Sequence, residues 1–329
     1  MTDLVKVRDL SVTYPRPRRS GGPLHAVRGV DLTMRRGETV GLVGESGSGK
    51  STIGSALLGL VPAADGTITF DGADITRASR ADRRLLARRM QVVFQDPYGS
   101  MNPAHTVADT LAESLRYNLA LPAEEIQKRV LRALDDVGLP PGAARRYPAA
   151  FSGGQRQRIA IARALVMEPD FIVCDEAVSA LDLSVQAQVL NLLARLKETR
   201  GLSYLFISHD LAVVRYLSDS IVVLYAGRVV ERGPAARVAE SPAHPYTRAL
   251  LAAAPVPDPV VQLGRRTERL RAVAAVAATP ARPGTGCDFA ARCPFAQEIC
   301  RTTRPELVDR EDGVAVACHR YDQITAQAA

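Results

Sequence analysis

The sequence has 329 residues and a net charge of +7, with 47% hydrophobic and 23% charged residues. This composition excludes a globally disordered chain, and the length suits one large domain with an appendage, because single cores stop growing at about 250–300 residues. The sequence contains neither a run of about 18 apolar residues nor a signal-peptide pattern, so we expect a cytoplasmic protein. The basic residues are scattered and tryptophan is absent, which argues against nucleic-acid binding.

The first third of the chain predicts several strands and one helix that follows a glycine-rich turn. Polar and apolar residues alternate in the first two strands, which we therefore expect to be half-buried, whereas the third is almost continuously apolar. Strands are expected at 4–14, 26–34, 38–43, 67–70 and 91–94, and a helix from Lys50 to Leu60. The order strand, glycine loop and helix is typical of an α/β fold.

The remainder predicts a helical insertion, further strands and a distinct C-terminal region. Residues 106–138 predict two helices, and strands are expected at 171–174, 203–208 and 220–225. Because strands and helices alternate, the sheet should be mostly parallel. From about Pro234 the chain becomes rich in Ala, Pro and Arg. We therefore predict a domain at 1–233 and a C-terminal extension at 234–329, with linkers at APVPDPVV and ATPARPG.

GESGSGKS, residues 44–51, matches the phosphate-binding loop, in which two glycines five apart precede Lys and Ser. Glycines let the backbone curl so that successive N–H groups converge on phosphate oxygens at a helix N-terminus. Lys50 should reach the β and γ phosphates, and the Ser51 hydroxyl should be a magnesium ligand. The predicted nucleotide-binding residues here are Gly44, Glu45, Ser46, Gly47, Ser48, Gly49, Lys50, Ser51 and Thr52.

FIVCDE, residues 171–176, predicts a buried strand that ends in two carboxylates. Asp175 at the carboxyl end of the strand can hold magnesium, and Glu176 can act on an attacking water as general base. Cys174 should be a buried small hydrophobic residue.

FSGGQRQRIAIARAL at 151–165 resembles the signature of the ATP-binding cassette (ABC) family. Four further residues stand where the family has its Q-loop, D-loop, switch histidine and adenine-contacting aromatic residue, and they are Gln95, Asp182, His209 and Tyr14. The resemblance implies that Gln95 and His209 act with Glu176 in catalysis, and that Gln95 also binds magnesium. It implies a P-loop NTPase fold with a RecA-like core, an antiparallel β subdomain, a helical subdomain at about 98–160 and a cysteine-containing extension.

The ABC resemblance also implies that the signature completes the ATP site of a second subunit. The residues expected to act there in trans are Ser152, Gly153, Gly154, Gln155 and Asp182. This sequence carries one phosphate loop and one signature, so it should pair with a second cassette, which we expect to be a paralogue.

A narrower resemblance, to oligopeptide and dipeptide importer ATPases, rests on CDEAVSALDLSVQAQVLNLL, HPYTRALLAAAPVPDP and the cysteine-containing tail. It implies two membrane permease subunits, an external substrate-binding protein and a peripheral position on the cytoplasmic face of the membrane. Relatives with this tail also move nickel or other small solutes, so the cargo stays open. A soluble non-transport ABC ATPase is the more distant alternative.

Four of the five cysteines lie in the extension, at Cys287, Cys293, Cys300 and Cys318. Their spacing lacks the close pairs common in structural zinc sites, and disulfides are not expected in a cytoplasmic ATPase. Four thiolates can hold a [4Fe-4S] cluster, and some importer ATPases that the tail resembles carry one. We predict such a cluster, with zinc or free thiols as the alternatives.

Overall fold

The computed structural model describes residues 2–15, 22–96, 99, 101–253, 285–311 and 313–326. The N-terminal part forms an antiparallel sheet with the strand order β2-β1-β4-β5. Its strands are β1 (Asp3–Tyr14), β2 (Leu24–Arg35), β4 (Asp65–Phe70) and β5 (Ala73–Asp74). The sheet therefore combines the predicted alternating strands with the short strand near residue 67.

The second sheet has eight strands in the order β11-β12-β10-β9-β3-β8-β7-β6. The five strands from β9 to β6 are parallel, and β10, β12 and β11 extend the sheet in antiparallel fashion. The bounds are β3 (Thr39–Val43), β6 (Met90–Val93), β7 (Phe171–Asp175), β8 (Ser203–Ser208), β9 (Ser220–Tyr225), β10 (Arg228–Pro234), β11 (Val308–Asp309) and β12 (Ala315–Val316). The prediction of a mostly parallel sheet is confirmed for its central strands.

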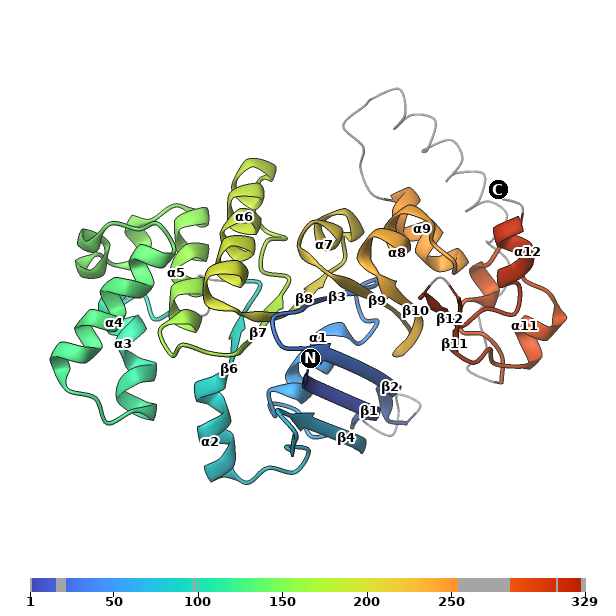
Figure 1. Ribbon diagram of the computed structural model, residues 1–329, viewed down its shortest axis with the longest axis horizontal. Coiled ribbons are helices and arrows are strands. Elements are labelled where there is room, and N and C mark those ends of the chain that lie inside the picture. Colours follow the sequence, from blue (N-terminus) through green and yellow to red (C-terminus); the bar gives the residue numbers. More distant parts are fainter. Residues whose placement is uncertain are drawn as a thin grey trace.

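Helices connect the parallel strands and form the two ends of the molecule (Figure 1). The α-helices are α1 (Lys50–Leu57), α2 (Arg80–Arg89), α3 (Val107–Asn118), α4 (Ala123–Asp136), α5 (Gly153–Leu165), α6 (Leu183–Arg200), α7 (Leu211–Leu217), α8 (Ala235–Glu240), α9 (Pro245–Ala253), α11 (Glu298–Thr302) and α12 (Tyr321–Ala326). Short 3-10 helices lie at η2 (Pro141–Arg145), η3 (Pro148–Ala150) and η4 (Ala290–Arg292). Among the described residues, no helix is both long and apolar enough to span a membrane.

The central strands are buried on both faces, so alternate residues enter two different cores. On β8, Tyr204 and Phe206 pack with the helices α5 and α6, whereas Leu205 and Ile207 face α1 and the antiparallel sheet. Helix α1 is therefore enclosed between the two sheets. This enclosure fixes the loop that precedes α1 at the edge of the main sheet.

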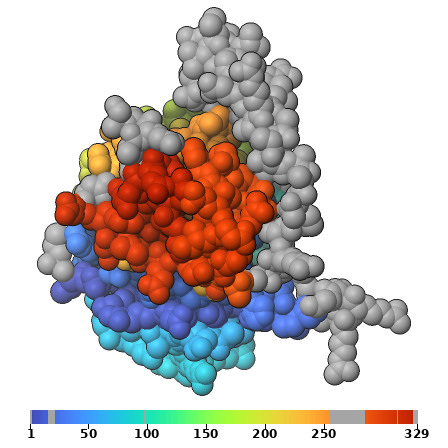
Figure 2. Space-filling model, turned by 90° about the vertical axis from the view of Figure 1, so that its right-hand side faces the viewer, coloured from blue at the N-terminus to red at the C-terminus, as the bar shows by residue number. Residues whose placement is uncertain are grey.

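The C-terminal region is not an independent appendage, because its strand β12 pairs with β10 of the main sheet. In Figure 1 this region lies at the opposite end of the molecule from α3 and α4. Figure 2 shows it from that end, where it covers much of the face above the N-terminal strands. Strands of two residues carry no periodic signal, so the sequence does not predict them. The expected linkers, APVPDPVV and ATPARPG, lie outside the described residues.

Gly41 provides a test of the packing between β3 and α7. A Cβ atom at this position would overlap Val214 and Ser218, so Gly41→Ala should destabilise the fold by about 1–3 kcal/mol. At Gly142 a Cβ would meet no atom within 4 Å, and Gly142→Ala is the matched control. We expect a lower midpoint of thermal unfolding for the first variant only. Equal midpoints would contradict the packing described here.

Candidate functional site

The candidate site lies where four parallel strands end at one edge of the main sheet. In the strand pairing Val43 of β3 lies beside Ser208 of β8, and Asp175 of β7 lies beside Ile207. Strand β6 pairs with β7 on the outer side. The segments that follow these strands carry the phosphate loop, Glu176, His209 and Gln95. Residues far apart in the sequence therefore meet because parallel strands end at the same edge, where α/β folds bind their ligands.

The phosphate loop follows β3 and leads directly into α1. Lys50 is buried, and its Nζ donates to the carbonyl oxygens of Gly44 at 2.7 Å and Glu45 at 2.9 Å. Burial lowers the pKa of Lys50, and the nearby carboxylates of Glu176 and Asp175 oppose this shift. The ammonium group thus lies inside the curl of the loop, where it is available for a phosphate group.

Gly49 takes a left-handed backbone conformation (φ 104°) directly before α1, and a Cβ here would overlap the carbonyl oxygen of Ala26. This close approach of backbone to backbone explains the need for glycine at the end of the loop.

Ser51 and Asp175 form the pair of oxygen groups beside the loop. The Ser51 hydroxyl donates to Asp175 Oδ1 at 2.8 Å. Burial raises the pKa of Asp175, and the hydrogen bond from Ser51 partly offsets that shift. The structure therefore brings together two of the three residues predicted to bind magnesium.

Glu176 and His209 lie side by side at the same edge. Glu176 has a left-handed backbone (φ 49°). Its N–H donates to the carbonyl oxygen of Ile207 on the neighbouring strand β8 at 3.0 Å. His209 Nδ1 lies 3.5 Å from Glu176 Oε2, and the histidine side chain is more exposed than the carboxylate. The pairing of β7 with β8 thus places the predicted base and the predicted switch histidine in contact.

Gln95 follows β6 and is exposed. Its Nε2 donates to the Ser179 hydroxyl at 3.3 Å, and that hydroxyl donates to the Glu176 carbonyl oxygen at 2.9 Å. Gln95 is thereby linked to the Glu176 backbone through Ser179, which belongs to the segment SALD at 179–182 that resembles the D-loop. Of the residues that follow Gln95, three lie outside the described part of the chain, and they are Pro97, Tyr98 and Ser100.

Tyr14 ends β1 and reaches the helix that follows the phosphate loop. Its hydroxyl donates to Thr52 Oγ1 at 3.4 Å. The contact places Tyr14 of the antiparallel sheet next to the start of α1.

The residues predicted to act in trans lie at the starts of two helices. Ser152 caps α5 in a capping box, in which its N–H donates to Gln155 Oε1 at 3.0 Å and its hydroxyl accepts from the Gln155 N–H at 3.4 Å. Asp182 caps α6, where Oδ1 accepts from the Val185 N–H at 3.0 Å. Hydrogen bonds from Val185 and Ser184 keep the pKa of Asp182 low.

Gly153 and Gly154 begin α5 between these two caps. A Cβ at Gly154 would overlap Val185 of α6, so glycine permits the close approach of the two helix starts.

The sequence analysis missed two residues that contact the phosphate loop. The Glu45 N–H donates to the Tyr246 hydroxyl at 2.7 Å, and both oxygens of the Glu45 carboxylate accept from Arg292 at 2.8 Å. Both partners belong to the C-terminal region. The motif HPYTRALL contains Tyr246, but nothing in its sequence indicated that the hydroxyl reaches a loop 201 positions away.

The prediction of a [4Fe-4S] cluster at Cys287, Cys293, Cys300 and Cys318 is wrong. Within the described residues, no group of three or more Cys, His, Asp or Glu side chains could hold a metal ion, which contradicts the zinc alternative as well. The four thiols are free and line one cavity of about 20 Å³, which has room for about one water molecule. Burial raises the pKa of Cys287 and of Cys293 to about 11, so these two thiols stay protonated.

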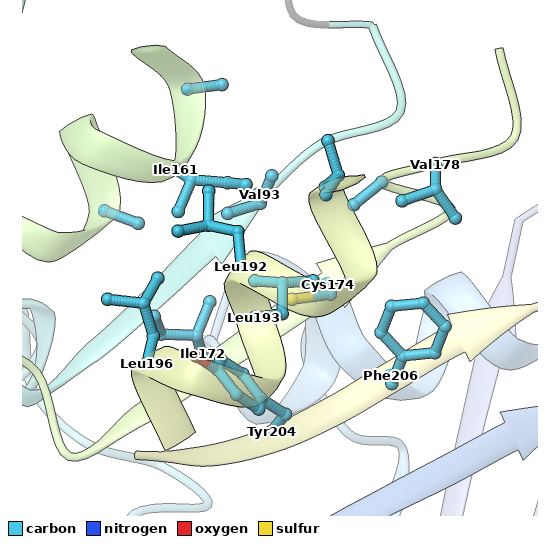
Figure 3. Packing of buried hydrophobic residues seen from close by; sticks show 14 of the residues in the cluster. Val93, Ile161, Ile172, Cys174, Val178, Leu192, Leu193, Leu196, Tyr204 and Phe206 are labelled. Atoms are coloured by element: carbon cyan, nitrogen blue, oxygen red, sulfur yellow. The ribbon is translucent and has the colours of Figure 1, made fainter. Parts of the chain in front are cut away.

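Cys174 is fully buried, as predicted (Figure 3). Its sulfur lies among Ile172, Leu193 and Phe206 in the core between the main sheet and α6. Burial raises its pKa to about 12, which keeps the thiol neutral and unreactive.

Comparison with known proteins agrees with this geometry. Residues 27–179 match the family model described as ABC transporter. A putative peptide import ATP-binding protein of Brucella ovis is 48% identical over 320 residues, which are 97% of this chain and 98% of that protein. The chain belongs to the ABC transporter family. The recognition made from the sequence, the ABC cassette fold and the ATPase class are therefore confirmed.

Further similarities concern the C-terminal region and the cassette. Residues 230–300 of this ABC protein match the family model described as oligopeptide/dipeptide transporter, C-terminal region. The oligopeptide transport ATP-binding protein OppF of Salmonella typhimurium is 45% identical over 302 residues, covering 92% of this chain and 89% of that protein. The chain thus belongs with the ATP-binding proteins of peptide importers.

Two solved structures match the cassette. CbiO1 of Clostridium perfringens, part of the ABC transporter complex cbiONQ, has a TM-score of 0.65 at 30% identity and covers 73% of this chain and 92% of its own. The cassette MJ0796, solved as a dimer bound to ADP and phosphate, has a TM-score of 0.63 at 29% identity, with 70% and 98% covered.

The thiol pKa values of this ABC protein give a testable reactivity. At pH 8 a thiol with a pKa of about 11 is about 100-fold less ionised than one at 9, so iodoacetamide should modify Cys287 and Cys293 slowly. The rate should rise about tenfold per pH unit towards pH 11, because the thiolate is the nucleophile. Mass spectrometry of the native chain, with the urea-unfolded chain as control, measures this. Equal rates in both states at pH 8 would contradict the burial effect.

Proposed function

We propose that this ABC protein hydrolyses ATP as one of two paired cassettes that drive an importer of oligopeptides or dipeptides. The observation that carries the proposal is the meeting of Lys50, the Ser51–Asp175 pair and the Glu176–His209 pair at one sheet edge. The match of residues 230–300 and the names of the relatives support peptides as the cargo. We further propose 1–233 as the nucleotide-binding domain, with a helical subdomain at about 98–160, and 234–329 as the C-terminal region.

The residues of the loop fit a nucleoside triphosphate with its magnesium ion. Ser51 and Asp175 supply the oxygen ligands that Mg²⁺ prefers, and Gln95 would add its amide oxygen. A cation here would also offset the cost of burying the Asp175 carboxylate, whose pKa burial raises. When bound, the ion neutralises charge on the phosphate groups. Lys50 and the loop N–H groups would hold the phosphates, and Tyr14 would pack against adenine.

Glu176 is the proposed general base for hydrolysis. Its carboxylate would orient a water for attack on the γ phosphate and accept the proton that the water loses. His209, which contacts the same carboxylate at 3.5 Å, would hold the base and the water in position. Gln95 would link this edge of the sheet to the membrane partner through the segment that follows it.

The signature at the start of α5 would act on ATP bound by the partner cassette. The helix N-terminus and the Ser152 hydroxyl can donate hydrogen bonds to a phosphate group, with Gly153, Gly154, Gln155 and Asp182 beside it. The dimeric structure of MJ0796 with ADP and phosphate supports such pairing as an arrangement for this family. We propose a paralogous partner cassette, two membrane permease subunits, an external substrate-binding protein and a position on the cytoplasmic face of the membrane.

Replacing the proposed base tests the assignment. Glu176→Gln keeps the size of the side chain but cannot accept a proton, so ATP hydrolysis by the assembled transporter should fall by about 10²–10⁴-fold while ATP still binds. Lys50→Ala is the contrasting variant and should lose ATP binding itself. Phosphate release and equilibrium nucleotide binding measure the two effects. Near-normal turnover of Glu176→Gln would remove this residue from catalysis.

Dependence on a second cassette is a separate expectation. The isolated chain should hydrolyse ATP slowly, with a specific activity that depends on protein concentration, because one chain cannot complete either site. Addition of the partner cassette and the permease subunits should raise the rate. A dilution series measures the dependence. Full turnover that is independent of concentration would contradict the shared site.

A further inference from the structure

Two side chains of the C-terminal region hold one residue of the phosphate loop. Tyr246 accepts a hydrogen bond from the Glu45 N–H at 2.7 Å, and Arg292 donates to both oxygens of its carboxylate at 2.8 Å. We call Tyr246 and Arg292 the C-terminal clamp. They come from separate segments, Tyr246 from the motif HPYTRALL and Arg292 from the cysteine-containing tail.

Tyr246 is itself held in place by the residues around it. The residue is fully buried, and its ring packs against Tyr225 with ring centroids 4.6 Å apart. Its N–H donates to His244 Nδ1 at 3.0 Å. The N–H of His244 in turn donates to the buried carboxylate of Glu231 on β10, at 2.8 Å. The tyrosine hydroxyl is therefore fixed relative to the main sheet through packing and hydrogen bonds.

Arg292 approaches the same loop from the other segment. Its guanidinium lies 5.6 Å from the centre of the Phe289 ring, and Phe289 lies 5.4 Å from the Tyr246 ring. The two arms of the clamp thus belong to one aromatic cluster. The side chains of Arg292 and Glu45 are 46% and 43% exposed, so solvent weakens the attraction, but the two-bond geometry is the strongest arrangement for such a pair. The hydrogen bonds from Arg292 lower the pKa of Glu45 and keep it charged.

We propose that the C-terminal clamp positions the phosphate loop for nucleotide, so that Tyr246 and Arg292 set the affinity for ATP. Lys50 bonds to the carbonyl oxygens of Gly44 and Glu45 and so braces the loop from inside. A phosphate group would draw the Lys50 ammonium away from these carbonyls. The clamp then supplies the contacts that keep the backbone of Glu45 in place. This proposal rests on the assignment of residues 44–52 as the nucleotide site.

The clamp is not needed merely to attach the C-terminal region. That region pairs with the main sheet through β12 and β10, and Asp288 accepts from Arg28 at 3.2 Å. Arg232 on β10 also pairs with Asp309 at 3.3 Å. These contacts do not involve Glu45, and they attach the region without the clamp. Loss of the clamp should therefore change nucleotide binding more than it changes folding.

The test measures binding of a fluorescent ATP analogue with Mg²⁺ by the full-length chain, together with thermal unfolding without nucleotide. Arg292→Ala and Tyr246→Phe should each weaken binding by about three- to tenfold, the effect of losing an ordinary hydrogen bond, because solvent exposure weakens the Arg292–Glu45 pair. Arg292→Lys, which keeps the charge but cannot form the two-bond fork, should recover part of the affinity. Arg232→Ala, which removes a contact of the C-terminal region away from the loop, is the matched control and should bind like the wild type.

The outcomes separate this inference from the proposed function. Wild-type affinity in both Arg292→Ala and Tyr246→Phe, or a loss no larger than in Arg232→Ala, would overturn the clamp while leaving the ATPase assignment intact. A fall in the unfolding midpoint with unchanged affinity would likewise reduce the contacts to a structural role and overturn the inference. Failure of the wild-type chain to bind the analogue would instead contradict the nucleotide site itself. If Arg292→Ala does not fold, Tyr246→Phe and Arg292→Lys decide the question.

Discussion

The structure depends on the tight curl of the phosphate loop between β3 and α1. Bonds within the chain hold this curl, because the Ser48 N–H donates to the Glu45 carbonyl oxygen and the Glu45 N–H donates to the Tyr246 hydroxyl. Lys50 bonds to two loop carbonyls from inside, and the close backbone approach at Gly49 fixes the start of α1. Enclosure of α1 between two sheets then prevents the loop from relaxing.

The same sheet edge explains why catalytic groups from distant parts of the sequence meet. The order β3-β8-β7-β6 places the ends of four strands in a row, and each end carries at least one group of the site. A charged residue at the end of a buried strand is costly unless it has a partner. Asp175 finds one in Ser51, and Glu176 contacts His209. The pairs that satisfy these carboxylates are also the groups that the proposed hydrolysis requires.

The C-terminal region differs most from expectation. Its four cysteines lie around one cavity, and burial raises the pKa of Cys287 and Cys293 to about 11. Within the described residues, however, no group of side chains could hold a metal ion, so four cysteines that line one cavity do not by themselves make a metal site. The contacts of this region that bear on function are instead made by Tyr246 and Arg292, whose polar groups reach the phosphate loop.

The sequence by itself indicated the family, through its resemblance to the ABC signature at 151–165, and it predicted the parallel core, because strand periodicity is a local pattern. SYLFIS and SIVVLY predicted β8 and β9 with their observed bounds, since continuous apolar runs mark strands that are buried on both faces. Only the tertiary structure decided how the C-terminal region joins the main sheet. Its two-residue strands, the protonation of its thiols and the contact between Arg292 and Glu45, 247 positions apart, arise from burial and pairing across the fold, which no local pattern encodes.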